Sequence, residues 1–119
     1  SCEDAADTYA IRLALEPAAL ALSIPHLAVA DWQRAQELIT DMDVEGDAGR
    51  LGELNRRFHM SLYAKAGRPR LLALVESQLA AFDRYLRFHL AAKGREHMSQ
   101  DEHRAMLAAA REGDIDAAV

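Results

Sequence analysis

A stretch in the middle of the chain, residues 51–62, constrains the fold more than any other. Its apolar side chains recur at steps of three and four residues: Leu51, Leu54, Phe58 and Leu62. At about 100° per residue, these positions share a narrow arc of an α-helix. Asn55 lies inside that arc and His59 at its edge, so both are on one helix face. The pattern therefore predicts an amphipathic helix that turns two polar side chains toward a core.

These inward polar side chains need partners, because an unsatisfied buried group costs about 1–3 kcal/mol. His103 poses the same requirement on another helix, whose apolar face is formed by Met106, Leu107 and Ala110. An amide and two imidazoles could converge on a metal ion or on a polar ligand inside a helical bundle. They could equally be core groups bonded to the backbone or to one another. As a metal site the set is weak, because Asn55 offers a neutral oxygen where a carboxylate would bind better.

Helical periodicity extends over most of the chain, and no segment shows the period-two alternation of a half-buried strand. Helices are predicted over residues 3–23, 26–42, 48–65 and 69–92, and a fifth from just before His103 to Gly113. A sixth begins at Ile115, and only its residues up to Val119 are present. We therefore expect an all-α fold: one domain over residues 1–119, an antiparallel bundle of about six helices with the last helix truncated.

Several boundaries follow from local residue chemistry. Pro17 predicts a kink or break in the first helix. Asp47 can cap the third helix, Gly67 can end it, and Pro69 suits the first turn of the fourth. Residues Ser99 to Glu102 fit the S-x-x-E capping box that is typical of a helix start. In the first two helices we expect the following side chains to be buried: Tyr9, Leu13, Leu20, Leu27, Val29, Trp32, Leu38, Ile39 and Met42.

Composition limits the classes of function. The formal net charge is −5, from 19 acidic and 14 basic residues that are interspersed. Without a basic block, the chain itself is poorly suited to binding a nucleic-acid backbone. The single cysteine, Cys2, cannot form an internal disulfide, and no apolar run approaches the ~18–20 residues of a membrane span. We expect a soluble cytoplasmic protein with no membrane contact, and both chain ends look like the ends of a fragment.

Three further side chains are candidates for ligand binding. Arg12 stands four residues before Glu16, which is most simply a surface ion pair, although an arginine facing a cavity would suit a carboxylate ligand. Arg84 allows the same two interpretations. His89 continues the apolar stripe of residues 69–92, but its place near the helix end favours partial exposure.

Catalysis has little support in the sequence. We find no nucleophile elbow, Gly-rich phosphate loop or H-E-x-x-H motif. Paired Glu-x-x-His motifs facing inward, which a di-iron bundle requires, are also missing. We expect no enzyme. A helical metalloenzyme using the same histidines and a purely structural dimerisation module stay as alternatives.

Four short motifs occur in a fixed order: Asn55-Arg56-Arg57-Phe58-His59, Ala66-Gly67-Arg68-Pro69, Glu102-His103-Arg104 and Ala108-Ala109-Ala110-Arg111-Glu112-Gly113-Asp114. Arg12 with Leu15-Glu16 adds an R-x-x-L-E pattern near the start. Together they resemble the FCD domain, the C-terminal effector domain of FadR-type regulators in the GntR superfamily. The resemblance covers nearly the whole chain.

The resemblance implies a pocket that senses a small organic acid, often with a divalent metal such as zinc, nickel or manganese. By position, His59 and His103 match metal ligands of the family, and Asn55 occupies the position where family members have an aspartate. The family's final histidine ligand would lie beyond Val119, so the resemblance implies an incomplete site in this chain. It further implies a homodimer. DNA would be bound only through an N-terminal winged helix-turn-helix domain that this chain lacks, and effector binding would change operator affinity.

Overall fold

The computed structural model describes residues 2–93, 100–114 and 116, and its architecture is a bundle of α-helices. The elements are α1 (Cys2–Ser23), η1 (Ile24–His26), α2 (Val29–Val44), α3 (Ala48–Tyr63), η2 (Ala64–Ala66), α4 (Pro69–Lys93) and α5 (Asp101–Arg111), where η1 and η2 are single 3-10 turns. No strand occurs among these described residues. The all-α bundle is therefore confirmed, with five α-helices in the described part; Ile115 and residues 117–119, where a sixth helix was expected, lie outside it.

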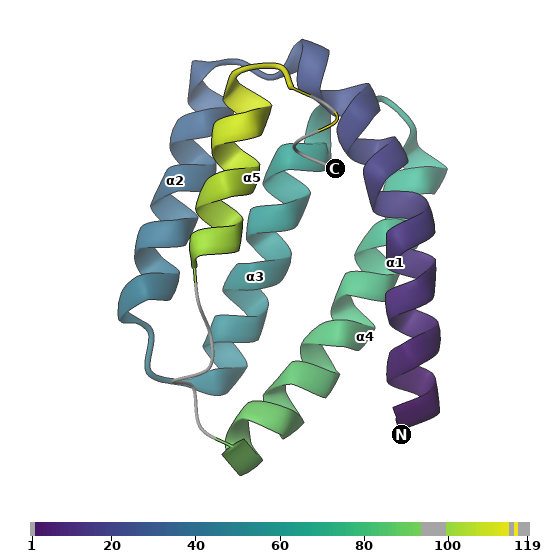
Figure 1. Ribbon diagram of the computed structural model, residues 1–119, viewed down its shortest axis with the longest axis vertical. Helices are drawn as coiled ribbons and strands as arrows, with labels where there is room; N and C mark the ends of the chain where they lie inside the picture. The colour runs from purple at the N-terminus through teal and green to yellow at the C-terminus, as the bar shows by residue number, and fades with distance from the viewer. Residues whose placement is uncertain (1, 94–99, 115, 117–119) are drawn as a thin grey trace.

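Helix α3 occupies the centre of the bundle (Figure 1). It packs against α2 on one side and α4 on the other, α1 packs along α4, and α5 packs on α2. The core between these helices is formed by fully buried apolar side chains: Leu20, Leu38, Ile39, Met42, Leu51, Phe58, Leu62, Tyr63, Val75 and Leu79. This arrangement places the inward face of α3 opposite α1 and α5.

The helix ends of the middle segment follow the predicted local chemistry. Asp47 is the N-cap of α3, and its carboxylate accepts a hydrogen bond from the backbone N–H of Gly49 at 3.1 Å. Gly67 adopts a left-handed φ of 67°, which only glycine accepts without strain. Pro69 is the first residue of α4. The predictions for Asp47 and Pro69 are confirmed, whereas α3 ends at Tyr63 and Gly67 is the C-cap of the following turn η2.

The structure corrects several expectations about the first two helices. α1 continues through Pro17 as one helix, which excludes the break that was the alternative to a kink there. α2 begins at Val29 rather than residue 26, because η1 takes the preceding residues. Val29, Tyr9 and Leu13 are each more than half exposed. Periodicity alone could not show that no neighbouring element covers these three side chains fully.

Helices α3 and α4 approach each other closely at Gly52. A Cβ atom on Gly52 would lie 2.0 Å from Oδ1 of Asp83, whose side chain is buried on α4. Real Cβ atoms do not come that close to a neighbour. The missing side chain therefore lets the two helices and the buried carboxylate pack together.

Candidate functional site

Two histidines from different helices meet inside the bundle. His59 on α3 and His103 on α5 have ring centroids 5.3 Å apart, in an edge-to-face arrangement of 77°. Phe58 packs against both rings, with centroid distances of 5.4 Å to His59 and 4.7 Å to His103. The structure thus brings together two of the residues that the sequence singled out. Asn55 is buried one turn before His59 on the same helix.

Hydrogen bonds fix how each imidazole carries its proton. Tyr63 donates its hydroxyl hydrogen to Oε1 of Glu16 at 2.5 Å, so its oxygen can accept from Nδ1 of His59, 3.3 Å away. Oε1 of Gln100 accepts from Nδ1 of His103 at 2.6 Å. In both rings the proton then sits on Nδ1, which leaves Nε2 with a lone pair for another partner.

An ion pair of α1 lies beside the histidines. Arg12 donates from Nε to Oε2 of Glu16 and from Nη2 to Oε1 at 3.4 Å. The two side chains are only 12% and 11% exposed, so the pair belongs to the interior and is not the surface pair of the simpler interpretation. The guanidinium also stacks over the ring of Phe82, 4.5 Å from its centroid.

These groups border a cavity of about 300 Å³ between α1, α3 and α5. It is lined by Tyr9, Arg12, Leu13, Glu16, Pro17, Leu20, His59, Tyr63, Glu102 and Met106. Sequence reasoning missed Glu16 and Tyr63 as site residues. A signal for Glu16 was present, because Glu16, Ala19, Leu20 and Ser23 follow the i, i+3, i+4, i+7 spacing of one helix face and all four are buried.

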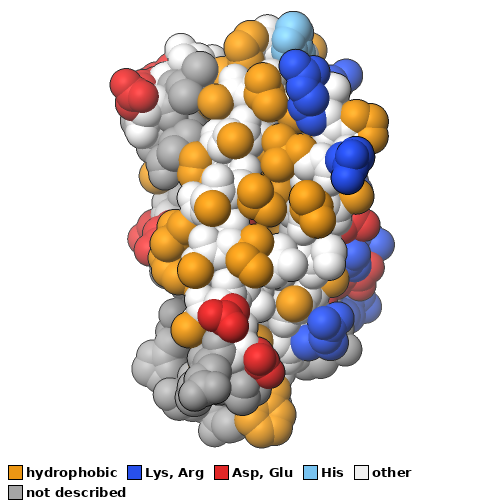
Figure 2. Space-filling view, turned by 90° about the vertical axis from the view of Figure 1, so that its right-hand side faces the viewer, with side chains coloured by type: hydrophobic (Ala, Val, Ile, Leu, Met, Phe, Trp, Pro, Cys, Tyr) orange, Lys and Arg blue, Asp and Glu red, His pale blue; other side chains and the backbone are white. Residues whose placement is uncertain are grey.

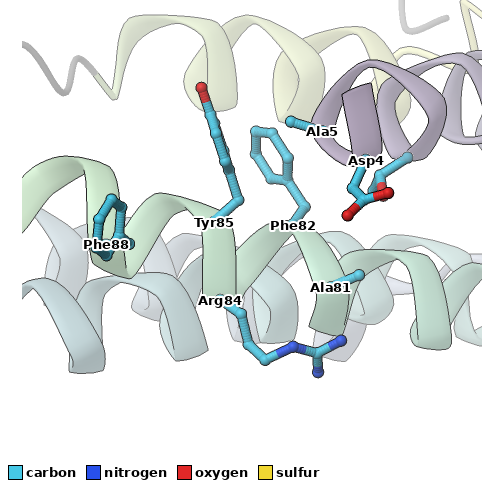
Figure 3. Close-up of a pocket in the computed structure, with 8 residues that line it drawn as sticks. Asp4, Ala5, Ala81, Phe82, Arg84, Tyr85 and Phe88 are labelled. Carbon is cyan, nitrogen blue, oxygen red and sulfur yellow. The ribbon is translucent and has the colours of Figure 1, made fainter. Parts of the chain in front are cut away.

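A second hollow, of about 340 Å³, lies between the start of α1 and the second half of α4 (Figure 3). The rings of Phe82 and Tyr85 stand between the two helices near Ala5, while the side chain of Arg84 points away from them. Arg84 is therefore separate from the cavity that Arg12 and His59 share. The side chain of His89 lies outside the described residues.

Burial and neighbouring charge set the protonation states in the first cavity. Burial, together with His103 and Arg12, holds the pKa of His59 well below its usual value. Burial and the charge of Arg12 lower the pKa of His103 to about 4. Burial and the carboxylate of Glu16 raise the pKa of Tyr63 well above its usual value. At neutral pH both imidazoles and the phenol are uncharged.

With this geometry established, comparison with known proteins identifies the family. The model of the FCD domain matches residues 7–119. This chain belongs to the FCD domain family. The FCD domain resembles a solved transcriptional regulator, a GntR family member from Pseudomonas syringae pv. tomato str. DC3000, with a TM-score of 0.91 and 45% identity. That match covers 98% of this chain and 49% of the other.

A second solved structure, McbR/YncC of E. coli, matches with a TM-score of 0.78 and 25% identity, over 94% of this chain and 58% of that one. This FCD domain therefore spans about half the length of the solved proteins it matches. No curated protein gives a significant match. In the described part of the FCD domain, no helix combines the length and apolarity needed to cross a membrane.

The donors present fit a resident divalent metal poorly. Among the described residues, no group of three or more His, Cys, Asp or Glu side chains is placed to hold a metal ion. Two imidazoles and the amide of Asn55 are fewer and weaker donors than the four that zinc takes in a structural site. The carboxylate of Glu16 lies 3.8 Å from Nδ1 of His59, but it is already bonded to Arg12 and Tyr63.

The lowered pKa values make the stability of this FCD domain depend on pH. Between the unfolded histidine pKa of about 6.5 and the folded value for His103 of about 4, the unfolded chain binds more protons than the native one. Stability is then complete above pH 6.5 and should fall by roughly 1 kcal/mol per pH unit for each buried histidine as the pH drops toward 5. Urea denaturation in chelator at a series of pH values measures this slope.

The His103→Gln variant should lose part of that slope, whereas His26→Gln, which alters an exposed histidine, should keep it. A wild-type free energy of unfolding that stays constant from pH 7 to pH 5 would contradict the assignment.

Proposed function

We propose that this FCD domain is the ligand-sensing part of a FadR-type GntR regulator, and that it binds a small organic acid in the cavity between α1, α3 and α5. The observation that carries the proposal is the guanidinium of Arg12 in the wall of that cavity. A small acid fits within about 300 Å³. The description of the P. syringae protein as a transcriptional regulator supports regulation over an enzymatic use of the same histidines.

Arg12 retains binding capacity despite its ion pair. A guanidinium has five N–H donors, and two hydrogen bonds to Glu16 use two of them. Its stacking on Phe82 and its low exposure hold it in one orientation. A carboxylate could therefore form a charge-assisted hydrogen bond with Arg12 while Glu16 stays in place.

The expected partner of this chain is a second copy of itself. α1 carries apolar side chains on the side opposite the core as well: Ala10, Ile11, Ala14, Ala18 and Leu22 are all exposed. Ala73 and Leu74 are exposed on the neighbouring α4. These seven residues form a surface that we call the α1–α4 face. Figure 2 shows hydrophobic side chains gathered along this side of the molecule.

Charge supports a two-fold arrangement of this face. Asp4 and Asp7 are exposed at the start of α1, and Arg68 and Arg70 are exposed where α4 begins, at the opposite end. Figure 2 shows acidic side chains in the lower part of this face and at its upper left, and basic ones along its right-hand side. In an antiparallel homodimer the acidic end of one copy would meet the basic end of the other, which is the self-complementarity of an isologous interface.

The proposed response is a shift between two states of such a dimer. The FCD domain has a net charge of −5, so DNA contacts would come from the N-terminal domain. An acid that binds one state more tightly than the other shifts the population, and with it the spacing of the two DNA-binding domains.

A divalent metal, zinc, nickel or manganese, stays a separate proposal. It would take His59 and His103 through Nε2, with Asn55 as a weak donor, and would need a further donor outside the described residues. When bound it would supply positive charge for an acid ligand. Elemental analysis of protein purified without chelator, beside a His59→Ala, His103→Ala double variant, tests this; equal metal content in the two would reject it.

In the full-length protein, replacing Arg12 with methionine should weaken binding of the acid effector by about tenfold or more, the loss expected for a hydrogen bond between charged groups. Binding is measured by calorimetry over a panel of small mono- and dicarboxylates. Arg12→Lys, which keeps the charge, checks that the loss is not unfolding, and Arg84→Met is the matched control in the other hollow. If no acid binds to an intact dimer, the FCD domain is a structural module and the proposal fails.

A further inference from the structure

Hydrogen-bond acceptors and negative charge are abundant in the cavity wall, which is unfavourable for binding a simple anion. Its charged lining residues are one guanidinium, Arg12, and two carboxylates, Glu16 and Glu102. An incoming carboxylate would make a third negative group around a single guanidinium, and Coulomb repulsion would oppose it.

Glu16 cannot easily leave to make room. Its carboxylate is almost fully buried and accepts hydrogen bonds from Arg12 and from Tyr63. Removing these partners would leave a buried carboxylate with neither charge nor hydrogen-bond compensation. A ligand is therefore expected to add to the Arg12–Glu16 pair rather than replace it.

Beside this wall, Pro17 removes the usual helical donor of one backbone acceptor. In a regular helix the carbonyl of Leu13 would accept from the N–H of residue 17, but proline has none. Leu13 and Pro17 both line the cavity. The lone pair on Nε2 of His59 and the carboxylate of Glu102, on the opposite helix α5, are further acceptors. These acceptors call for a ligand that donates several hydrogen bonds and carries positive charge.

One kind of small molecule meets both requirements. A carboxylate would pair with the remaining donors of Arg12, and an ammonium on the same molecule would face Glu102 and the other acceptors. Leu13, Leu20 and Met106 provide apolar contacts for a side chain. Resting on the proposed function, we propose that the effector is a zwitterion of the amino-acid class, carrying a carboxylate and an ammonium, rather than a simple organic acid.

The test compares ligands that differ only in these two groups. Binding to the full-length protein is measured by calorimetry in the presence of chelator. Each series contains an amino acid, the matching acid without the ammonium and the matching amine without the carboxylate: leucine, 4-methylpentanoate and 3-methylbutylamine in one, and phenylalanine, 3-phenylpropanoate and 2-phenylethylamine in the other. Small mono- and dicarboxylates are tested beside them. We expect an amino acid to bind about tenfold or more tightly than its deaminated partner. If simple acids or dicarboxylates bind as tightly as the amino acids, the proposal of a zwitterionic effector is wrong, while the proposed acid-sensing function is retained. Failure of every carboxylate to bind would reject both.

Glu102→Gln separates recognition of the ammonium from recognition of the carboxylate. This variant should weaken amino-acid binding by about tenfold while leaving 4-methylpentanoate and 3-phenylpropanoate unchanged or slightly tighter. Glu112→Gln, an exposed position at the end of the same helix, is the matched control and should change neither. Equal affinity of wild type and Glu102→Gln for the best amino acid would overturn the assignment.

Discussion

Replacing Glu16 with glutamine should lower the free energy of unfolding by about 2 kcal/mol or more. The substitution keeps the shape of the side chain but leaves the guanidinium of Arg12, which is 12% exposed, without its opposite charge. Breaking one side of a buried pair costs far more than the pair itself contributes, because the remaining charge stays desolvated. Tyr63 would also exchange a charged acceptor for a neutral one. Urea denaturation at pH 7 measures the change.

The chain contains its own control for this experiment. Glu53 and Arg57 on α3 form an ion pair at 2.7 Å with the same four-residue spacing, but their side chains are 42% and 53% exposed. Glu53→Gln should change the free energy of unfolding by about 0.5 kcal/mol or less. Similar losses for the two variants would mean that the Arg12–Glu16 pair is solvated and that Arg12 is not a buried cation in the cavity wall.

Replacing Ala14 with glutamate should disrupt self-association. Ala14 lies in the middle of the α1–α4 face, opposite the side of α1 that packs in the core. In an isologous dimer near the two-fold axis, each copy would bring an unpaired carboxylate into an apolar contact. We expect the dissociation constant of the full-length dimer to rise by about a hundredfold or more, since burying an unpaired charge costs several kcal/mol. Sedimentation equilibrium measures it.

Ala30→Glu makes the same chemical change at an exposed position on α2, away from the α1–α4 face, and should leave the dimer intact. Circular dichroism should show both variants folded, because each position is exposed. A dimer that tolerates Ala14→Glu would place the interface elsewhere on the molecule.

The parts of the fold that follow from local chemistry could be predicted from the sequence. Asp47, Gly67 and Pro69 each act through their own backbone or the next turn, so no tertiary information was needed. Val29, Tyr9 and Leu13 were misplaced because burial depends on which neighbour covers a helix face. Leu13 and Tyr9 border the cavity, where no helix of the described part covers them fully.

The candidate site was predictable only in part. An inward histidine on each of two helices indicated that His59 and His103 could meet, and they do. The connection through Tyr63 to Glu16 joins residues 47 positions apart, and spacing along the chain contains no information about such contacts. Arg12 shows the same limit, because an i, i+4 pair has the same sequence pattern whether it is solvated or buried.

The contacts of α5 with α2 affect how the helices could move when a ligand binds. Arg104 pairs with Asp43 of α2, and the guanidinium of Arg111 lies 5.7 Å from the ring of Trp32, also on α2. Helix α5 thus packs on and pairs with α2. Helix α1 packs on α4 and is hydrogen-bonded through Tyr63 to the end of α3. The cavity follows the seam between these two groups of helices. A molecule bound by Arg12 on α1 and Glu102 on α5 would link these two groups of helices directly, so that a movement of one group is transmitted to the other.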